Sequence, residues 1–406
     1  MTPIGSTPVT GPLRVLVVGP APAGATSRGG MATVVALMAA HPDERIRITV
    51  VPTFVDRSVW WRLVVGVRGM LRSTWLVLRG EADVVHVHLA HGGSVIRKAL
   101  PLWAARRTGV PTVVHAHSYD FGGWFDRQPR PVRAVVRRML VADQWLVLGN
   151  RQVAEYATRL RLTSSRVSVL HNAVPMPDAP SIRSGAARVH AVALGRLGAR
   201  KGSYDLIAAV AELDAAVRSG LRVTLAGDGE VDEVRAAVAR AGLGDTIDVL
   251  SWLDPASRDE LLRDADIFVL PSRHEGLPMA LLEAMAFGLA PVTTMVGSIG
   301  DAISDRVDGL VVQPGCPNQI AEALKALVTD GDLRVRLGSA ARDRARDFGL
   351  DRWYQQLTRL WTGLANRPRL PGDFPVQTST RKIPQECAMR RVATPVPAIR
   401  RKEAPR

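Results

Sequence analysis

The stretch Ile267–Gly288, IFVLPSRHEGLPMALLEAMAFG, predicts a strand, a turn and a helix in direct succession. Its first four residues form an apolar run typical of a buried strand, which Pro271 ends. Gly276 allows a tight turn, and Pro278 suits the first turn of a helix over Met279–Phe287. A strand followed at once by a helix is the repeating unit of a parallel sheet, and the free amide groups at the start of such a helix favour phosphate.

The same alternation of apolar runs and helical patterns extends over most of the chain. In the first half, strands are expected at Leu13–Val18, Ile48–Val51, Val84–His88, Thr112–His115, Gln144–Leu148 and Val167–Leu170. Helices are expected between them at Met31–Ala40, Val95–Arg107 and Pro131–Val141. In the second half, strands are expected at Val189–Leu194, Val223–Ala226, Ile247–Leu250, Ile267–Leu270, Ala290–Thr293 and Gly309–Val312. This order predicts parallel pairing through right-handed crossovers.

A chain of 406 residues exceeds the usual size of one core and suits two domains. We expect a flexible leader over 1–12, a first doubly wound α/β domain over 13–175 and a second over 188–349. A linker rich in Pro, Ser and Ala would separate them. A final helix at about 350–365 would join the first domain, and a basic, proline-rich tail over 366–406 would be disordered. Two facing sheets would form a cleft at the carboxyl ends of their strands.

The formal net charge of +15 favours an anionic partner, either nucleic acid or a membrane surface. The tail contributes ten Lys or Arg residues against three Asp or Glu residues. No helix-turn-helix, RNA-binding or zinc-finger pattern is present in the sequence, so nucleic-acid binding is not expected.

Two cysteines, Cys316 and Cys387, make a disulfide framework or a cysteine metal site unexpected. The first fourteen residues lack the pattern of a secretory signal. The long apolar stretch Val59–Leu78 contains three arginines, which argues against a membrane span. We therefore expect a cytoplasmic protein, with a peripheral position on the inner face of the cell membrane left open.

Two glutamates flank the turn before the helix over Met279–Phe287. Glu275 lies in the loop, and Glu283 lies about one helical turn into the helix. Carboxylates repel phosphate, but they accept strong hydrogen bonds from neutral hydroxyl groups such as those of a sugar. The alternative is a capping acid and a solvated acid on the helix surface.

In each half of the chain, one glycine-containing loop follows the first strand. The loop Gly195–Gly202 carries Arg196 and Lys201, which could hold a diphosphate; the alternative is an ordinary basic loop. Gly29 and Gly30 open a helix and could bring backbone amides to phosphate. They do not satisfy the spaced dinucleotide-binding fingerprint.

The histidines His86 and His88, and likewise His115 and His117, have strand spacing, so both members of each pair should face one side. A zinc site is conceivable, but the spacing fixes no third ligand, and we expect no metal. Polar residues with satisfied hydrogen bonds at strand ends are the alternative. His117 differs because it precedes a loop that could line the cleft.

These features together resemble the family-4 retaining glycosyltransferases of the GT-B fold, which has two Rossmann-like domains. The resemblance runs from about Leu13 to Leu364. It is carried by Gly29-Gly30, by His117 at its strand end, by the loop from Gly195-Arg196 to Lys201, and by Glu275 with Glu283.

The resemblance implies roles for the residues around the donor phosphates and the reacting centre. Arg196 and Lys201 would bind the donor diphosphate and stabilise its charge as it departs. Gly29 and Gly30 would close on the phosphates from the first domain. His117 would reach the donor sugar near the reacting centre.

The resemblance also implies roles around the sugar and the nucleoside. Glu275 would hold hydroxyls of the transferred sugar, together with the backbone of Gly276-Leu277-Pro278. Glu283 would accept hydrogen bonds from the ribose, and Leu253 and Arg258 would lie near the base.

The implied activity is retaining transfer of a sugar from a nucleotide diphosphate donor to a saccharide or lipid-linked acceptor, in cell-envelope or exopolysaccharide synthesis. The resemblance implies no obligatory metal or other cofactor. A nucleotide-sugar epimerase of the same architecture and a non-catalytic sugar-nucleotide-binding scaffold are the alternatives.

Basic side chains in the expected acceptor domain leave membrane binding open. A helical pattern over Val59–Arg79 places Arg68, Arg72 and Arg79 on one face, with tryptophans nearby. A second basic helix follows over 130–138. Such faces could lie on anionic lipid, or they could be ordinary solvated helix surfaces.

Overall fold

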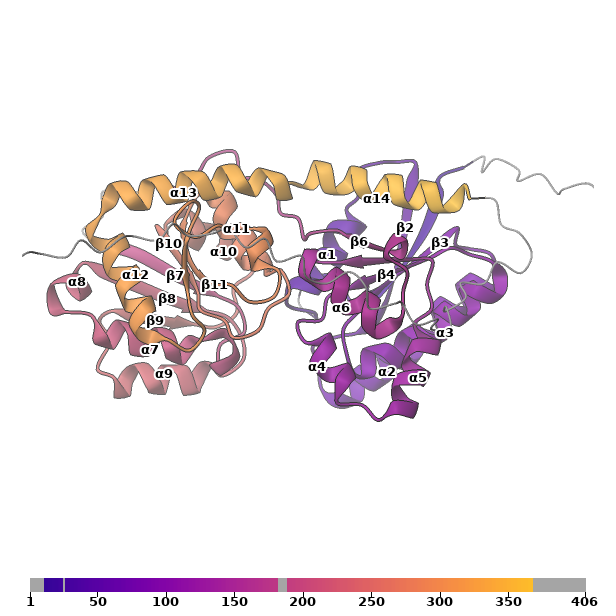
Figure 1. Ribbon diagram of the computed structural model, residues 1–406, viewed down its shortest axis with the longest axis horizontal. Coiled ribbons are helices and arrows are strands. Elements are labelled where there is room, and N and C mark those ends of the chain that lie inside the picture. Colours follow the sequence, from indigo (N-terminus) through magenta and orange to yellow (C-terminus); the bar gives the residue numbers. More distant parts are fainter. Residues whose placement is uncertain (1–10, 25, 182–187, 368–406) are drawn as a thin grey trace, which may run out of the picture. The chain divides into compact units, whose positions relative to one another are not determined.

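The computed structural model describes residues 11–367, except residue 25 and residues 182–187, and contains two parallel six-stranded sheets (Figure 1). The strands of the first sheet are β1 (Leu13–Pro20), β2 (Ile46–Phe54), β3 (Val84–Leu89), β4 (Thr112–Ala116), β5 (Gln144–Val147) and β6 (Val167–Val169). Those of the second sheet are β7 (Val189–Leu194), β8 (Leu221–Ala226), β9 (Ile247–Leu250), β10 (Ile267–Leu270), β11 (Ala290–Thr294) and β12 (Leu310–Val312). The strand orders are β2-β1-β3-β4-β5-β6 and β12-β11-β10-β7-β8-β9.

Helices connect successive strands in both halves. The first half contains α1 (Gly30–Ala39), α2 (Val59–Leu78), α3 (Gly93–Thr108), α4 (Phe121–Asp126), α5 (Arg130–Met139) and α6 (Asn150–Leu160). The second half contains α7 (Ser203–Glu212), α8 (Ala215–Ser219), α9 (Val231–Arg240), α10 (Pro255–Arg263), α11 (Met279–Phe287), α12 (Pro317–Thr329) and α13 (Gly331–Ala345). The helix α14 (Leu350–Ala365) follows α13. The predicted doubly wound α/β fold is therefore confirmed.

All twelve predicted strands are present, and the differences lie at their ends. The largest difference is at β2, which pairs with β1 along nearly its whole length, from Ile46 opposite Leu13 to Phe54 opposite Pro20. This strand is at the edge of the sheet, and polar residues alternate with apolar ones along it. A search for continuous apolar runs finds central strands buried on both faces and shortens such an edge strand.

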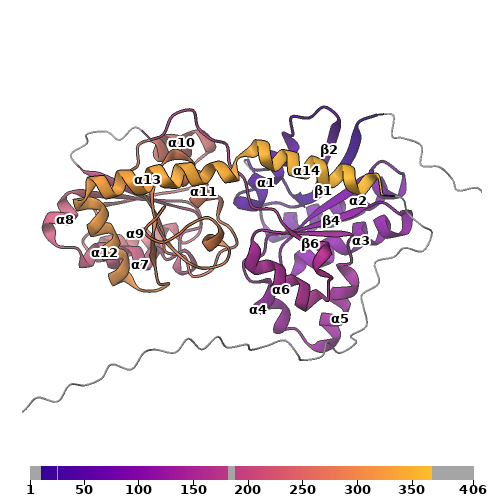
Figure 2. The same ribbon diagram turned by 45° about the horizontal axis from the view of Figure 1, so that its top comes forward.

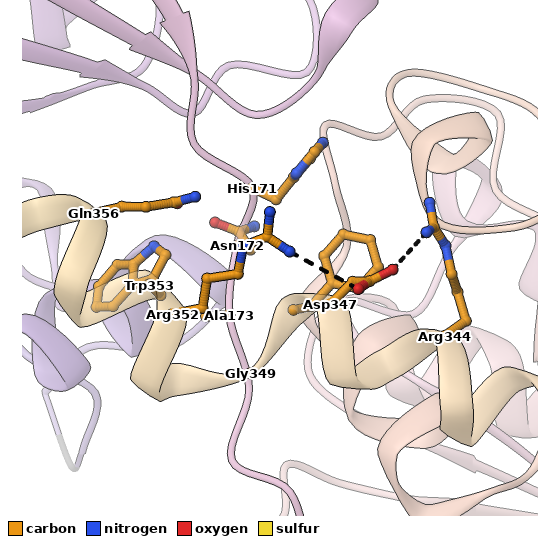
Figure 3. Close-up of a pocket in the computed structure, with 10 residues that line it drawn as sticks. His171, Asn172, Ala173, Arg344, Asp347, Gly349, Arg352, Trp353 and Gln356 are labelled. Atoms are coloured by element: carbon orange, nitrogen blue, oxygen red, sulfur yellow. Dashed lines mark hydrogen bonds and ion pairs between the residues drawn. The ribbon is translucent and has the colours of Figure 1, made fainter.

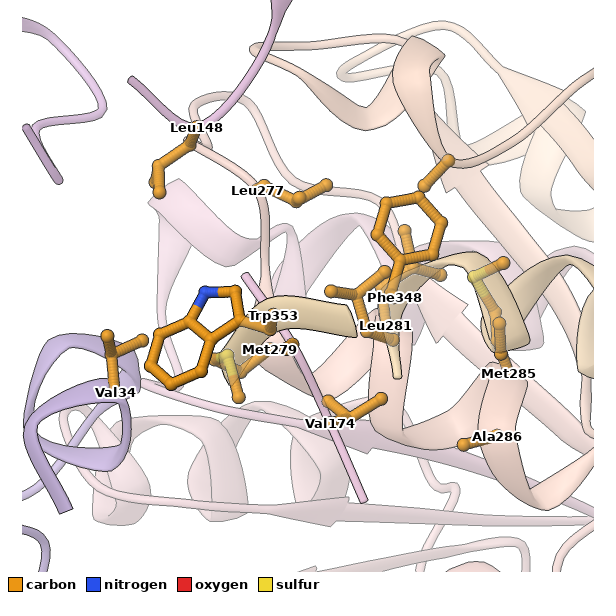
Figure 4. Packing of buried hydrophobic residues seen from close by; sticks show 14 of the residues in the cluster. Val34, Leu148, Val174, Leu277, Met279, Leu281, Met285, Ala286, Phe348 and Trp353 are labelled. Carbon is orange, nitrogen blue, oxygen red and sulfur yellow. The ribbon is translucent and has the colours of Figure 1, made fainter. Parts of the chain in front are cut away.

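Helices cover both faces of each sheet and form three apolar cores. In the first half, α2 to α6 cover one face, while α1 and α14 cover the other. In the second half, α7, α8, α9 and α12 cover one face, while α10, α11 and α13 cover the other. One core is continuous from the first sheet to the second, through α11 and α14 (Figure 4). This continuity fixes α11 beside residues of both halves.

The helix α14 returns to the first half and binds it through polar contacts as well as apolar packing (Figure 2). The Tyr354 hydroxyl donates to the Leu37 carbonyl at 2.8 Å, and Thr358 Oγ1 lies 3.1 Å from His41 Nε2. The Trp361 indole N–H donates to His86 Nδ1 at 3.1 Å. A bridge between Val174 and Gly349 joins the two segments that run between the halves.

Some sequence-based expectations concern other parts of the chain. Of the leader expected over 1–12 and the tail expected over 366–406, residues 1–10 and 368–406 lie outside the described residues, as does the end of the expected linker at 182–187. Within the residues that are described, no helix is both long enough and apolar enough to cross a bilayer.

The contact between α2 and β2 depends on a glycine. A β-carbon at Gly69 would collide with the backbone carbonyl of Pro52, which cannot rotate away as a side chain can. We predict that Gly69→Ala lowers the free energy of unfolding by about 1–3 kcal/mol, as overpacking does elsewhere. Thermal unfolding followed by circular dichroism would measure the loss.

The control is Gly363→Ala in α14, where no atom of residues 11–24, 26–181 and 188–367 lies within 4 Å of the added methyl group. This variant should be as stable as the parent or slightly more stable, because alanine favours helix. Equal melting temperatures for the two variants would contradict the prediction.

Candidate functional site

A cavity of about 670 Å³ lies among the loops that follow the strands of both sheets. All twelve residues predicted for the site line it: Gly29, Gly30, His117, Arg196, Lys201, Leu253, Arg258, Glu275, Gly276, Leu277, Pro278 and Glu283. Loops at the carboxyl ends of parallel strands meet at one edge of each sheet, which is why residues distant in sequence converge here.

The loop before α11 and the first turn of α11 form one wall of the cavity. Pro278, Met279 and Ala280 line the cavity at the start of the helix. Every residue of α11 except Ala280 is buried, so packing on all sides holds the helix in place. The unpaired backbone amides of its first turn form a positive end that suits an anion.

Gly276 is needed for close packing. The chain bends at Gly276, as predicted, although its φ lies outside the left-handed region. A β-carbon there would lie 3.0 Å from Leu148 Cδ1 of the first half. The glycine therefore lets the loop of the second half pack directly against the first.

Asn172 holds the same loop from the linker side and was not predicted as a site residue. Its Nδ2 donates to the Leu277 carbonyl at 2.6 Å, and the side chain is buried. Asn172 also lines a smaller cavity of about 260 Å³ (Figure 3). In that cavity Arg344 and Arg352 share one carboxylate, Asp347, at 2.6 and 3.9 Å, so one of the two positive charges is balanced there.

Lys201 and Glu275 form an ion pair inside the large cavity. Lys201 Nζ lies 2.7 Å from Glu275 Oε1, and the two side chains are only 15% and 8% exposed. Gly195 makes the pairing possible, because its φ is +136° and a β-carbon would lie 3.2 Å from Lys201 Cε.

Two arginines of the same loop differ in their surroundings. Arg196 is exposed at the cavity. Arg200, which was not predicted, donates to the His274 carbonyl at 3.1 Å and lies 4.0 Å from Glu275 Oε1. Its guanidinium also lies 5.0 Å from the ring centre of Tyr119, which belongs to the first half. The basic residues of the loop indicated that a cation would lie at the cavity. They did not show that Arg200 is the side chain that lies against Tyr119 of the other half.

Glu283 is buried and paired, so the alternative of a solvated helix acid is wrong. Arg258 Nη1 donates to Glu283 Oε1 at 2.8 Å, and the carboxylate side chain is 9% exposed. Burial raises the pKa of Glu283 above its ordinary value, and the charge of Arg258 offsets part of this effect. One carboxylate oxygen of Glu283 is thus bound by Arg258, which was expected to lie near the base of the nucleotide.

The first half contributes the start of α1. Gly29 has a φ of +88°, which an L-residue rarely adopts. A β-carbon on Gly30 would lie 3.2 Å from Met279 Cγ, so the starts of α1 and α11 approach closely. Arg28, which was not predicted, lies 5.5 Å from the ring centre of Trp252 across the cavity.

The four histidines form one cluster instead of two separate pairs. His86 and His88 lie on β3, His115 lies on β4 and His117 follows it, with ring centres 4.2 to 5.5 Å apart. The pairs meet because β3 and β4 are neighbours with His88 opposite His115. The expectation that all are satisfied is wrong, since both nitrogens of His115 are buried and have no hydrogen-bond partner among the described residues.

The cluster also supplies the third metal ligand that spacing alone did not reveal. Nitrogens of His86, His88 and His115 lie within 4.8 Å of one another, the one such group found among the described residues. However, Trp361 donates to His86 Nδ1, so the single proton of neutral His86 must be on Nε2. His86 then has no lone pair left, and the donor set does not fit a three-nitrogen metal site.

The raised pKa of Glu283 has a consequence for stability. A folded-state pKa above the unfolded value means that folding favours the protonated form, so stability decreases as pH rises from the unfolded pKa through the folded one. We predict that Glu283→Gln, which removes this titration, becomes more stable relative to the parent as pH rises from about 4 to 7.

Calorimetric melting temperatures of both proteins across this pH range would measure the difference. A difference that is constant over the range, or that changes with the opposite sign, would show that the folded-state pKa is not raised.

Two family matches cover most of the chain. Residues 19–176 match the family described as Glycosyltransferase Family 4, and residues 186–344 match Glycosyl transferases group 1. The D-inositol 3-phosphate glycosyltransferase of Actinosynnema mirum is 30% identical over 315 residues, which are 71% of this chain and 74% of that protein. The 2-deoxystreptamine N-acetyl-D-glucosaminyltransferase of Streptomyces fradiae is 29% identical over 341 residues, 77% of this chain and 79% of that protein.

Solved structures share the fold. Anabaena HepE in complex with UDP superimposes with a TM-score of 0.69 at 16% identity, covering 87% of this chain and 100% of that one. WaaG, a glycosyltransferase involved in lipopolysaccharide biosynthesis, gives 0.64 at 18% identity, covering 86% of this chain and 100% of that one. The resemblance seen in the sequence is confirmed, and the chain is a glycosyltransferase of family 4 with the GT-B fold.

Proposed function

We propose that this enzyme is a retaining glycosyltransferase that moves a sugar from a nucleotide diphosphate donor to a saccharide or lipid-linked acceptor of the cell envelope or an exopolysaccharide. The observation that carries the proposal is the convergence of basic side chains, two helix starts and a buried carboxylate on one cavity. HepE, which shares the fold, has been solved in complex with UDP-glucose. This supports a nucleotide diphosphate sugar as the class of donor.

In this proposal the diphosphate binds between the starts of α11 and α1, where Arg196 and Lys201 balance its charge. Lys201 now contacts Glu275 at 2.7 Å. A bound diphosphate would share the lysine charge, which leaves the carboxylate oxygens of Glu275 available to hydroxyls of the sugar. Glu283 would use its second oxygen for the ribose, since the first is held by Arg258.

The proposed reaction retains the anomeric configuration through front-side attack. The bond from the anomeric carbon to the phosphate oxygen breaks, the bond to the acceptor oxygen forms on the same face, and the leaving phosphate oxygen takes the acceptor proton. Stabilisation of the leaving diphosphate then dominates, and cations with helix starts supply it without an obligatory metal. Burial lowers the pKa of His117 to about 3, so this ring is neutral near pH 7 and serves to bind the donor sugar.

Replacement of Lys201 tests the proposed donor site. After a thermal-shift screen of nucleotide sugars has identified a donor, Lys201→Ala should lower kcat by about 10²–10³-fold, the effect of removing one charge-stabilising donor. The matched control is Lys325→Ala, because Lys325 pairs with Asp214 on the surface. Unchanged turnover in Lys201→Ala would contradict the proposal.

The stereochemistry and the reaction type need their own readout. Proton NMR of the product should show the anomeric configuration of the donor, and an inverted product would overturn the retaining mechanism. Accumulation of a free epimer without transfer would instead support the alternative of an epimerase.

We further propose that the acceptor side of the enzyme lies on an anionic membrane. Along α2, large apolar side chains recur every three or four residues and are exposed to solvent: Trp60 (71%), Leu63 (55%), Val67 (42%), Leu71 (55%), Trp75 (51%) and Leu78 (54%). Arg68, Arg72 and Arg79 lie beside this stripe and are also exposed. An apolar stripe flanked by arginines matches a helix that lies in the surface of anionic lipid.

Neighbouring helices extend this apolar surface. Exposed side chains occur on α3, at Ile96 and Trp103, and on α5, at Val132 and Val135. The three helices pack in sequence, with α3 between α2 and α5. The surface belongs to the half that the resemblance assigns to the acceptor, which fits a lipid-linked acceptor.

Vesicle sedimentation tests the membrane proposal. The variant Trp60→Ser with Leu71→Ser should bind phosphatidylglycerol vesicles at least about tenfold more weakly than the parent, because each side chain loses its apolar burial. Val307→Ser, which changes an exposed apolar residue of the second half, is the control. Equal binding of all three proteins, or equal binding to neutral and anionic vesicles, would contradict the membrane proposal.

A further inference from the structure

A line of hydrogen bonds runs from the cavity into the apolar core. His117 Nε2 lies 2.9 Å from His88 Nδ1, and His88 Nε2 lies 3.1 Å from Met38 Sδ. The rings of His88 and His117 are stacked, with centres 5.0 Å apart and planes inclined by 26°. His88 and Met38 are completely buried, while His117 lines the cavity.

The direction of these hydrogen bonds follows from Met38. A thioether sulfur carries no hydrogen and can only accept, so His88 Nε2 must carry a proton. A neutral imidazole has one N–H, so His88 Nδ1 accepts and His117 Nε2 donates. By the same count, His117 Nδ1 carries a lone pair.

Both rings are neutral at ordinary pH. Burial lowers the pKa of His117 to about 3 and that of His88 well below its usual value. Nearby rings do not compete for the same nitrogens, since in the described part of the chain the His115 ring makes no hydrogen bond and Trp361 donates to His86 instead. Gly19 lies close to the His88 ring, since a β-carbon added there would be 3.2 Å from His88 Cδ2.

We propose that Met38 and His88 are positioning residues that hold His117 in its Nε2–H form, so that its Nδ1 accepts a hydrogen bond from a hydroxyl group of the sugar in the cavity. The two ring nitrogens point in different directions, and with Nε2 engaged by His88, Nδ1 is the one left to the cavity. Within the described residues, Nδ1 has no hydrogen-bond partner. This inference rests on the proposed donor site.

The hydrogen bonds that run from Met38 through His88 to His117, called the relay below, also determine which donor sugars fit beside His117. A ring nitrogen that can only accept will bind an O–H group and will repel a carboxylate or phosphate oxygen at the same position. His117 thus selects a donor with a neutral hydroxyl group there over one with an acid, such as a uronic acid. The opposite tautomer would present an N–H group and reverse this preference.

Tautomers are measured directly by long-range ¹H–¹⁵N NMR of the full chain labelled with [¹⁵N]histidine. The His117 signals are assigned by their loss in His117→Gln. We expect the parent to show a protonated Nε2 and an unprotonated Nδ1. In Met38→Leu, which keeps similar volume but removes the acceptor, the Nε2–H form should lose population. Met285→Leu, also a buried methionine, should leave the signals unchanged.

Kinetics then test the consequence for the donor. Met38→Leu should lower kcat/KM about tenfold for the hydroxylated donor, as expected for one lost hydrogen bond. A donor lacking that hydroxyl should be used equally well by parent and variant. An equal loss with both donors would mean that Met38 acts only through packing, which would overturn the inference.

The outcomes separate this inference from the proposed function. An unchanged His117 tautomer in Met38→Leu, or nitrogen shifts of a metal-bound ring together with a stoichiometric metal in the purified protein, would overturn the relay whatever the activity. A tautomer that shifts as expected in a protein that transfers sugar from no nucleotide donor would leave the relay standing and overturn the proposed donor.

Discussion

The burial of α11 on almost all sides is the constraint on which the site depends. Eight of its nine residues are buried; they pack against the second sheet and α13, and its apolar side chains belong to the core that the two sheets share (Figure 4). A helix held in this way cannot shift without opening the core that the two sheets share. Its first turn, and the glutamate on either side of that turn, are therefore fixed at the cavity by apolar packing.

Apolar packing alone would not tolerate two buried carboxylates. Glu275 and Glu283 are each paired with a cation, Lys201 and Arg258 respectively, at 2.7 and 2.8 Å. Desolvation makes such pairs poor contributors to stability, and removal of one partner is costly. The pairs are better understood as parts of a binding site, where charges kept apart from water interact strongly with a ligand that enters.

The histidine cluster, like the two carboxylates, consists of polar groups buried in the molecule, but its members are neutral. Three imidazoles, those of His86, His88 and His115, lie buried inside the first half, and burial lowers their pKa values. Hydrogen bonds arrange the protons of His86 and His88, and the groups that do so, the Trp361 donor and the Met38 acceptor, come from helices on the same face of the sheet. The orientation of a ring at the cavity thereby depends on a residue in the core.

The sequence by itself determined the strands, the bounds of α11, those of α1, α2, α3, α5 and α14 to within about two residues, and twelve of the residues that line the cavity. Strands buried on both faces are continuous apolar runs, and Pro and Gly mark where strand gives way to helix, as at Pro271 and Pro278. The site residues follow strand ends in the chain, so their convergence could be expected from topology.

Only the tertiary structure decided which of these residues are partners. Lys201 meets Glu275, and Trp361 meets His86 from 275 positions away in the chain. Asn172 and Arg200 gained their places beside the cavity in the same way. Hydrophobic periodicity predicts which face of a helix or strand is buried, but it does not predict which other element covers that face. A side-chain pairing across the core therefore has no local signal in the sequence.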